Sequence, residues 1–428
     1  IVIDREVEIT QVGFVFGESE SQLLDTLRMT YSENTFTRQI TDLTPQTIYY
    51  YQAFAKYDGR TVLGDVVLFR TKSNDTDGTI DNPLTIENAE EWRTFAEAMQ
   101  QSENQSISTY KGFEIYNCGE DTYFELAADI DLADCNNTIV SKFGGHFNGA
   151  GNTVTIRLNE QLGAATAFRN LENAFVDSLN ILVPTSFGVR EDVEAYGALC
   201  LNAKSSAISN CTTLVASENV RVIASGGGKF GGFAGNSINS TIVNCINNLS
   251  MELSATSYLW GGGIVGNIEG GSVSGCTNNA VITGVYAGGI AGQIMDATLS
   301  SNLNAGNIIG QEMVGGIVAS ITDGIVLVDK CMNIAEIFAT NQGCRFVSIG
   351  GIVGFNSITN YINIIPNRTN SESQRNSQIA NLTISNCANY GSFTDLSMQL
   401  GGLFGNGLAN MSNNVSVPQF SGVNAEGN

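Results

Sequence analysis

A repeat of about 26 residues constrains the fold of this chain more than any other feature. Residues 260–284 read WGGGIVGNIEGGSVSGCTNNAVITG, and residues 286–310 read YAGGIAGQIMDATLSSNLNAGNIIG. Both hold, in the same order, a glycine pair, an apolar run, a polar turn, a second apolar run and an asparagine-bearing turn. The unit is too strand-rich for a helical solenoid and lacks the blade signature of a propeller. It therefore predicts a parallel β-solenoid with one repeat per turn.

Residues at fixed offsets within the repeat support this prediction. The second glycine of the pair, or its equivalent, stands at Gly197, Gly232, Gly263, Gly289, Gly316, Gly351 and Gly402. A cysteine or asparagine follows at Cys211, Cys245, Cys276, Asn302, Cys331, Cys387 and Asn414. Two residues further on stand Asn247, Asn278, Asn304, Asn333 and Asn389.

These columns have structural meaning because equivalent residues of successive solenoid turns stack about 4.8 Å apart. The glycines are expected where a corner needs positive φ or where two backbones approach closely. The asparagines are expected to hydrogen-bond from turn to turn. Asparagine replaces cysteine at two positions of the cysteine column, so the pattern favours buried free thiols over disulfides. Cys118 and Cys135 lie outside the repeat and are the better candidates for a bridge.

One amphipathic helix is expected before the repeats. Residues 88–101 read NAEEWRTFAEAMQQ, with Asn88 as N-cap and Glu91 three residues later. One face is apolar and consists of Ala89, Trp92, Phe95, Ala96 and Met99. An exposed sheet edge would pair with other chains, so the helix is predicted to cover the first turn as a lid.

Residues 13–72 alternate strand-like runs and turns, which predicts a small antiparallel sandwich. Residues 42–60, DLTPQTIYYYQAFAKYDGR, resemble the E-to-F corner of fibronectin type III modules. The resemblance implies that the Tyr49 hydroxyl bonds back to the backbone while Tyr51, Ala53 and Ala55 share its face. Too few residues precede VGFVF for two opening strands. Either the chain begins inside this domain or the sandwich is incomplete.

A second resemblance covers roughly Thr79 to the end of the chain. The runs GGIVG, GGIAG and GGLFG, with YFELAADIDLAD and GHFNGAGNTV upstream, resemble the GLUG-motif repeat family and the segment that commonly precedes it in bacterial surface proteins. The resemblance implies a secreted or outer-surface adhesin-like protein of the Bacteroidetes type, as in Bacteroides. Attachment as a lipoprotein, through a lipid anchor upstream, is one option it leaves open.

Together these patterns predict an all-β fold: an N-terminal β-sandwich followed by a helix-capped, right-handed parallel β-helix. The expected parts are the sandwich over residues 1–73, a linker over 74–87, the capping helix and first coils over 88–195, and the repeat β-helix over 196–428. The handedness follows the general rule for parallel crossovers and the family resemblance.

The charge balance argues against two classes of partner. The chain holds 20 Lys and Arg against 42 Asp and Glu, a formal net charge of −22. Such a surface repels phosphate backbones and anionic lipids. No apolar stretch approaches the roughly 20 residues that span a bilayer. We therefore expect no nucleic-acid partner and no membrane-embedded segment.

Polysaccharide lyases and glycoside hydrolases also use a parallel β-helix, so such an enzyme is the alternative function. The sequence contains few residues that could act in catalysis. Arg190, Arg221 and Arg345 fall in different repeats without a recurrent acid pair, and the one histidine, His146, stands in a predicted turn. Nucleophilic schemes that pair serine or cysteine with histidine would need that single residue. We predict no catalytic residue and no cofactor.

Metal sites are also weakly indicated. Asp129, Asp131 and Asp134 could supply oxygen ligands to calcium, but they lack the glycine and terminal acid of a full calcium loop. The cysteines lack the close paired spacing that zinc needs. No metal is predicted, and calcium at the three aspartates is left open.

Binding is indicated by aromatic residues at equivalent repeat positions. Trp260 and Tyr286 precede the glycine pairs of their repeats, Met313 follows in the same column, and Tyr258 lies nearby. If the column faces outward, Tyr258, Trp260 and Tyr286 form a step that stacks on sugar rings; the alternative is an inward ladder that fills a corner. The expected function is a non-catalytic, adhesin-like surface protein that binds glycan or protein ligands outside the cell.

Overall fold

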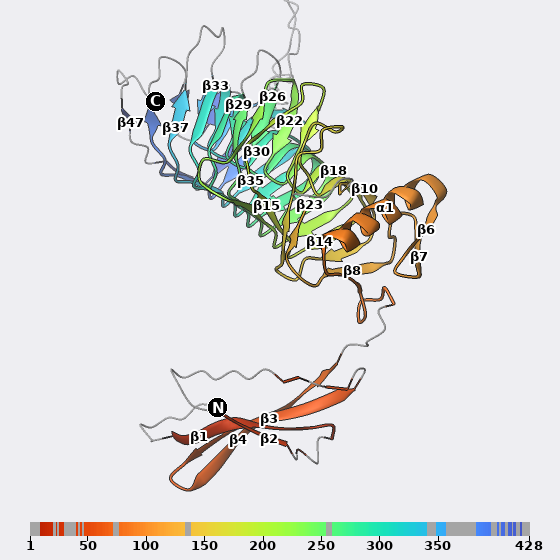
Figure 1. Cartoon of the computed structure of the whole chain (residues 1–428). Coiled ribbons are helices and arrows are strands. Elements are labelled where there is room, and N and C mark those ends of the chain that lie inside the picture. The colour runs from red at the N-terminus through yellow and green to blue at the C-terminus, as the bar shows by residue number, and fades with distance from the viewer. Residues whose placement is uncertain are drawn as a thin grey trace, which may run out of the picture. The chain divides into compact units, whose positions relative to one another are not determined.

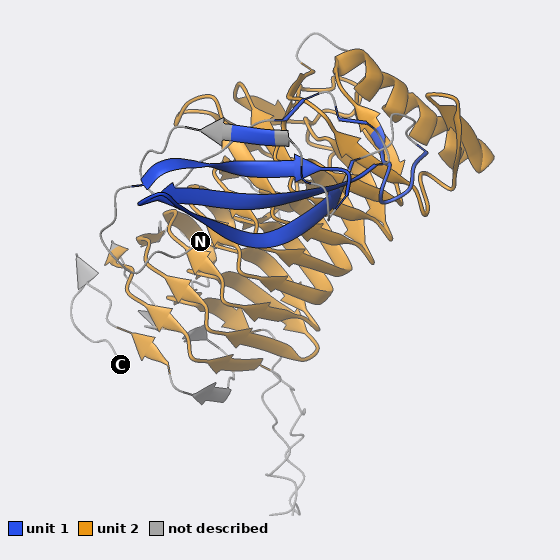
Figure 2. Cartoon of the chain, turned by 90° about the horizontal axis from the view of Figure 1, so that it is seen from below, with its two compact units in different colours: residues 1–84 blue, residues 85–428 orange. Residues whose placement is uncertain are grey.

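The structure is a computed structural model. It describes residues 9–19, 23, 25–29, 40–41, 43–44, 47–71, 77–132, 138–253, 259–339, 348–356, 382–394, 400–401, 404–406, 410–412, 414–416 and 420–421. The chain divides into two compact units, residues 1–84 and residues 85–428, which Figure 2 colours separately. Among the described residues, no helix has the length and apolarity to cross a membrane.

Unit 1 contains one antiparallel sheet in the order β2-β1-β3-β4. Its strands are β1 (Ile9–Gly17), β2 (Asp25–Met29), β3 (Ile48–Tyr57) and β4 (Arg60–Arg70). The buried Tyr49 ring stacks on Phe16 with centroids 4.9 Å apart. Its hydroxyl accepts a hydrogen bond from the backbone N–H of Thr44 at 2.9 Å and donates one to Glu18 at 3.1 Å. The predicted hydrogen bond between the Tyr49 hydroxyl and the backbone is therefore confirmed.

The sandwich itself stays a prediction, because the described strands of unit 1 belong to one sheet.

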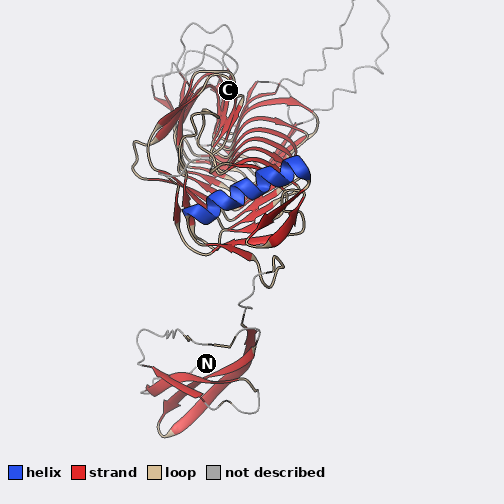
Figure 3. Cartoon of the chain, turned by 45° about the vertical axis from the view of Figure 1, so that its right-hand side comes forward, coloured by secondary structure: helices blue, strands red, loops and turns tan. Residues whose placement is uncertain are grey.

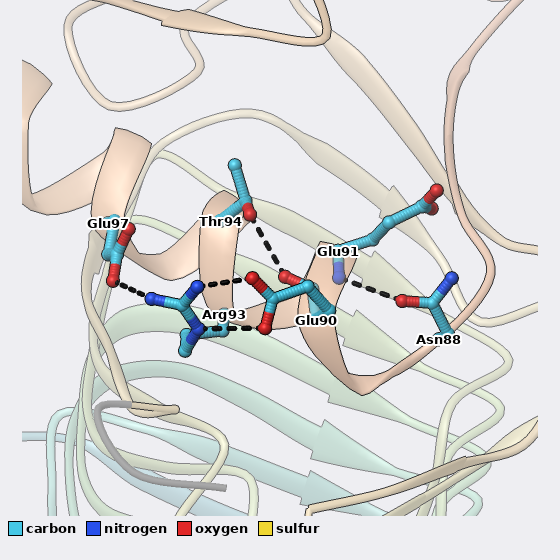
Figure 4. A network of polar contacts seen from close by, with 6 residues as sticks. All are labelled: Asn88, Glu90, Glu91, Arg93, Thr94 and Glu97. Atoms are coloured by element: carbon cyan, nitrogen blue, oxygen red, sulfur yellow. Dashed lines mark hydrogen bonds and ion pairs between the residues drawn. The ribbon is translucent and has the colours of Figure 1, made fainter.

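The predicted helix is confirmed as α1 (Ala89–Gln105). Asn88 is its N-cap, and its side-chain oxygen accepts a hydrogen bond from the N–H of Glu91 at 3.0 Å (Figure 4). The Glu91 carboxylate in turn accepts the N–H of Glu87, the residue before the N-cap, at 2.8 Å. On the exposed side, Arg93 pairs with Glu90 and with Glu97. The buried side consists of Trp92, Phe95, Ala96, Ala98, Met99 and Ser102.

Helix α1 covers one end of the stacked strands, as Figure 3 shows. The Trp92 ring meets Phe147 and Phe168 of the first turns, with centroids 5.7 and 6.0 Å apart. Its indole N–H donates to the carbonyl of Thr138 at 2.7 Å. An antiparallel pair, β6 (Ile107–Tyr110) and β7 (Phe113–Tyr116), follows the helix. The predicted lid is thus anchored by a fully buried aromatic side chain.

Unit 2 is a parallel β-solenoid built from three long sheets, which Figure 1 shows stacked along its axis. The largest sheet has 18 strands in the part of the chain that the structure describes. They are β5 (Leu84–Ile86), β8 (Tyr123–Leu126), β10 (Val140–Phe143), β11 (His146–Asn148), β13 (Phe168–Glu172), β14 (Phe175–Asp177), β18 (Cys200–Lys204), β19 (Ala207–Ser209), β23 (Ala234–Val243), β27 (Val265–Ser274), β30 (Ala291–Met295), β31 (Thr298–Ser300), β34 (Val318–Asp323), β35 (Val326–Asp329), β39 (Val353–Asn356), β40 (Leu382–Ser385), β44 (Phe404–Asn406) and β45 (Asn410–Ser412).

The second sheet has ten strands among the described residues. They are β9 (Ile130–Asp131), β12 (Thr153–Thr155), β15 (Asn180–Val183), β20 (Thr212–Val215), β24 (Ile246–Asn247), β28 (Thr277–Asn278), β32 (Leu303–Asn304), β36 (Met332–Asn333), β41 (Ala388–Asn389) and β46 (Val415–Ser416).

In the third sheet, the described residues form 13 strands. They are β16 (Phe187–Val189), β17 (Ala195–Tyr196), β21 (Arg221–Ala224), β22 (Gly228–Gly231), β25 (Ser250–Leu253), β26 (Leu259–Gly262), β29 (Ile282–Gly288), β33 (Ile308–Gly315), β37 (Ile337–Ala339), β38 (Ser348–Gly350), β42 (Phe393–Thr394), β43 (Leu400–Gly401) and β47 (Phe420–Ser421). The parallel β-solenoid predicted from the repeat is confirmed.

A ladder of buried asparagines runs through the ten-stranded sheet. The side-chain amide of Asn247 donates to the side-chain oxygen of Asn278, and the same bond links Asn278 to Asn304, Asn304 to Asn333 and Asn333 to Asn389 at 2.7–2.9 Å. Each of the first four amides also donates to the backbone carbonyl two residues ahead. The predicted turn-to-turn hydrogen bonding is confirmed.

The cysteine column consists of buried free thiols, as predicted: Cys211, Cys245, Cys276, Cys331 and Cys387. Asn302 fits the same column because its oxygen accepts the N–H of Cys276 at 3.0 Å and its amide donates to the carbonyl of Val273 at 2.9 Å. Cys118 is also a buried free thiol, and burial raises its pKa to about 11. Cys135, the other candidate for a bridge, lies outside the described residues.

Candidate functional site

The predicted aromatic step forms part of a continuous side-chain column on the third sheet. Trp260 in β26 pairs in register with Tyr286 in β29, and their rings stack with centroids 4.9 Å apart and planes 24° apart. Lys229 in β22 precedes them, with its ammonium nitrogen 3.6 Å from the centre of the Trp260 ring. Met313 in β33 follows Tyr286. We call Lys229, Trp260, Tyr286 and Met313 the aromatic column.

The aromatic column lies on the face of its strands opposite the solenoid interior. Leu259 and Gly261, which flank Trp260 along β26, are buried, so Trp260 points the other way. The column is nevertheless partly covered, because Tyr286 packs with Val285 and Ala319 and is only 7% exposed. The other three members are half-buried. The aromatic surface that a ligand could reach is therefore smaller than it would be if all the rings of the column were exposed.

The predicted third ring, Tyr258, lies outside the described residues. Lys229, which the sequence analysis did not single out, takes the place beside Trp260. Burial lowers the pKa of the Lys229 ammonium. A cation held against an indole face contributes from about 0.5 to about 2 kcal/mol, the larger value when both groups are desolvated. Lys229 stands two residues before Gly231, the same offset at which Trp260 precedes Gly262, so the repeat spacing could have identified this neighbour.

The described candidates for catalysis and metal binding make structural contacts. Arg190 pairs with Asp192 and donates to the carbonyl of Gln161 at 2.8 Å, and Arg221 pairs with Glu252 in the next turn at 3.0 Å. Arg345 lies outside the described residues.

No group of three or more His, Cys, Asp or Glu side chains in the described part of the chain is placed to hold a metal ion. Asp129 accepts the N–H of Thr153 in the next turn at 2.7 Å, which gives its carboxylate a structural partner. Asp134 lies outside the described residues.

His146 differs from its sequence-based interpretation. It opens strand β11, where a turn was predicted, and its ring is stacked between those of Tyr123 and Phe175. The centroid distances are 4.1 and 4.5 Å, and the planes deviate by 9° and 2°. The sequence did not predict this stack, because the first turns precede the regular repeat and the three residues are unequally spaced.

The pH response of His146 follows from its burial. Burial lowers its pKa below the ordinary value of 6.5, against a smaller opposing effect of Asp121. The unfolded chain therefore takes up this proton at a higher pH than the folded chain, so the His146 contribution destabilises the fold as pH falls below about 6.5.

We expect NMR titration of the one imidazole to give a pKa below 6.5. The variant His146→Phe is expected to remove this part of the pH dependence of the melting temperature. A pKa at or above the ordinary value would contradict the half-buried, stacked environment.

No protein-family model matches the chain, and no curated protein matches it. Two solved structures are similar to parts of it. One is described as a "putative immunoglobulin A1 protease" from Bacteroides ovatus, with 20% identity and a TM-score of 0.44 over 64% of this chain and 79% of that one. The other, described as "IgA1 Protease", has 12% identity and a TM-score of 0.36 over 96% of this chain and 28% of that one.

Similarities this weak carry no argument about this chain, and the solenoid assignment rests on its own strand register. The GLUG-motif and fibronectin resemblances stay sequence-based predictions.

Proposed function

We propose that this chain is a non-catalytic, adhesin-like module of the outer cell surface that binds glycan or protein ligands along its solenoid. The observation that carries the proposal is the aromatic column, in which two stacked rings and an ammonium occupy equivalent positions on successive turns, outside the interior. A site on paired strands is held more rigidly than one on loops, which reduces the entropy lost on binding. The surface location comes from the GLUG-motif resemblance.

The contacts of the polar residues favour binding over the lyase or hydrolase alternative. General acid and base catalysis needs titratable groups that converge on a substrate with tuned pKa values. His146 is stacked between two rings, and Arg190 and Arg221 are engaged in ion pairs. These residues support the scaffold.

The test is a panel of plant, host and microbial glycans in which both retention and chain length are measured. We expect retention without shortening. Trp260→Ala is expected to lower affinity by about 1 kcal/mol or more, roughly fivefold, because aromatic contacts at binding sites contribute on this scale. The variant should stay folded, although losing the stacking on Tyr286 and the Lys229 contact is expected to lower its melting temperature.

Tyr116→Ala is the matched control, because it removes an exposed ring far along the chain from the column. Unchanged affinity of Trp260→Ala would remove the aromatic column from the site, and loss of folding would show that the ring belongs to the core. Unsaturated or shortened sugar products would establish the enzymatic alternative.

A further inference from the structure

A second aromatic row lies on the outside of the solenoid near its helix-capped end. Tyr123 in β8, His146 in β11 and Phe175 in β14 occupy equivalent positions on three adjacent parallel strands. The next residue along each strand is buried: Phe124, Phe147 and Val176. Because side chains alternate along a strand, the three stacked rings point away from the interior. We call Tyr123, His146 and Phe175 the outer ring row.

The outer ring row ends with an uncovered ring face. Phe175 is 51% exposed. The position that follows it in the stack, on β19, is Ala207, so the far side of the Phe175 ring meets a single methyl group. The near side is fixed by His146 at 4.5 Å. The stack therefore holds one aromatic face toward solvent in a defined orientation.

A polar row runs beside the rings on the same face. Two residues further along the same strands stand Glu125, Asn148 and Asp177. The Asn148 amide donates to the Glu125 carboxylate at 3.0 Å. Burial raises the pKa of Asp177, but hydrogen bonds from Ser178, Ser209 and Asn210 outweigh it and lower the pKa overall. Asp177 therefore stays ionised as a hydrogen-bond acceptor.

A ring face with carboxylate and amide groups about 7 Å away along the strand has the two elements that a pyranose needs. The C–H face of the sugar packs on the aromatic face, and its hydroxyls donate to the carboxylates. The two carboxylates of the polar row, together with the net charge of −22, repel uronates and sulfated sugars. Charge thus selects neutral sugars over anionic ones.

We propose that Phe175, held by His146 and Tyr123 and flanked by Glu125 and Asp177, is a subsite for a neutral pyranose of a glycan chain. This rests on the proposed function and names the ligand class at a site separate from the aromatic column. Phe175 supplies the stacking face, and Asp177 accepts sugar hydroxyls.

The experiment uses cellohexaose, mannohexaose and maltohexaose as probes of the full chain. Saturation-transfer NMR reports contact with sugar C–H groups, and the imidazole resonances of the one histidine report binding at the outer ring row. We expect at least one probe to shift the His146 resonances. Phe175→Ala is expected to lower the affinity for that probe by fivefold or more without lowering the melting temperature. Tyr390→Ala is the control: it removes another ring that is 50% exposed, and it should leave the affinity unchanged.

His146→Phe keeps the stack and is expected to keep binding, which separates stacking from any proton-dependent role of the imidazole. The proposal is overturned if no probe shifts the His146 resonances, or if Phe175→Ala binds as tightly as the unmutated protein. If Trp260→Ala abolishes glycan retention and Phe175→Ala does not, the proposed function stands and this subsite is rejected. Absence of retention on the whole glycan panel would instead count against glycan binding itself.

Discussion

Gly289→Val is expected to destabilise the solenoid by at least about 3 kcal/mol, at the upper end of ordinary overpacking costs. A side chain at Gly289 would place its Cβ well under 3.0 Å from the carbonyl oxygen of Gly316 and from the Asn304 side chain, distances that real Cβ atoms do not show. Neither neighbour can move freely, because both belong to turns fixed by the strands on either side. The variant would push two turns apart where the asparagine ladder joins them.

The measurement is the melting temperature followed by circular dichroism. Gly188→Val is the control, since this glycine lies on an exposed position of β16 and a Cβ there would meet nothing within 4 Å. Valine suits an exposed strand, so the control should melt at or above the temperature of the unmutated protein. Equal melting of the two variants would contradict the close approach at Gly289.

Asn304→Ala is expected to cost a similar amount for a different reason. The substitution removes the acceptor of the Asn278 amide and the donor to the Asn333 side chain, and it also breaks the bond to the carbonyl of Gly306. All three asparagines are fully buried, so the groups left behind cannot turn to water. Each unsatisfied buried group costs about 1 to 3 kcal/mol, which gives a total of at least about 3 kcal/mol.

Asn279→Ala is the control that distinguishes loss of a buried ladder asparagine from loss of any asparagine. Asn279 is exposed, and its amide donates to Asn248 of the preceding turn at 3.0 Å. Water can replace this bond, so we expect a loss below about 1 kcal/mol, measured by denaturant unfolding alongside Asn304→Ala. A loss for Asn304→Ala no larger than for Asn279→Ala would show that the ladder does not stabilise the turns.

The ladder also explains the glycine column that the sequence displayed. The sequence left two reasons for glycine open, positive φ and close backbone approach. Gly263, Gly289 and Gly316 have no positive φ, and a Cβ at each would collide with the next glycine of the column and with an asparagine of the ladder. Close approach of neighbouring turns is therefore the reason that glycine is required at these positions. It also links the glycine column to the asparagine column.

The sequence by itself determined the solenoid, because stacking equivalent turns imposes the same steric and hydrogen-bonding demand at each repeat position. That demand is visible as columns of glycine, cysteine and asparagine, and the apolar spacing after Asn88 likewise determined the capping helix. The tertiary structure alone decided which side chains meet on the outside. Tyr123, His146 and Phe175 are separated by unequal intervals because the connections between the early strands differ in length, so only strand register brings their rings together. Exterior positions bear no common packing demand, and the repeat pattern therefore did not predict how far Tyr286 would be covered.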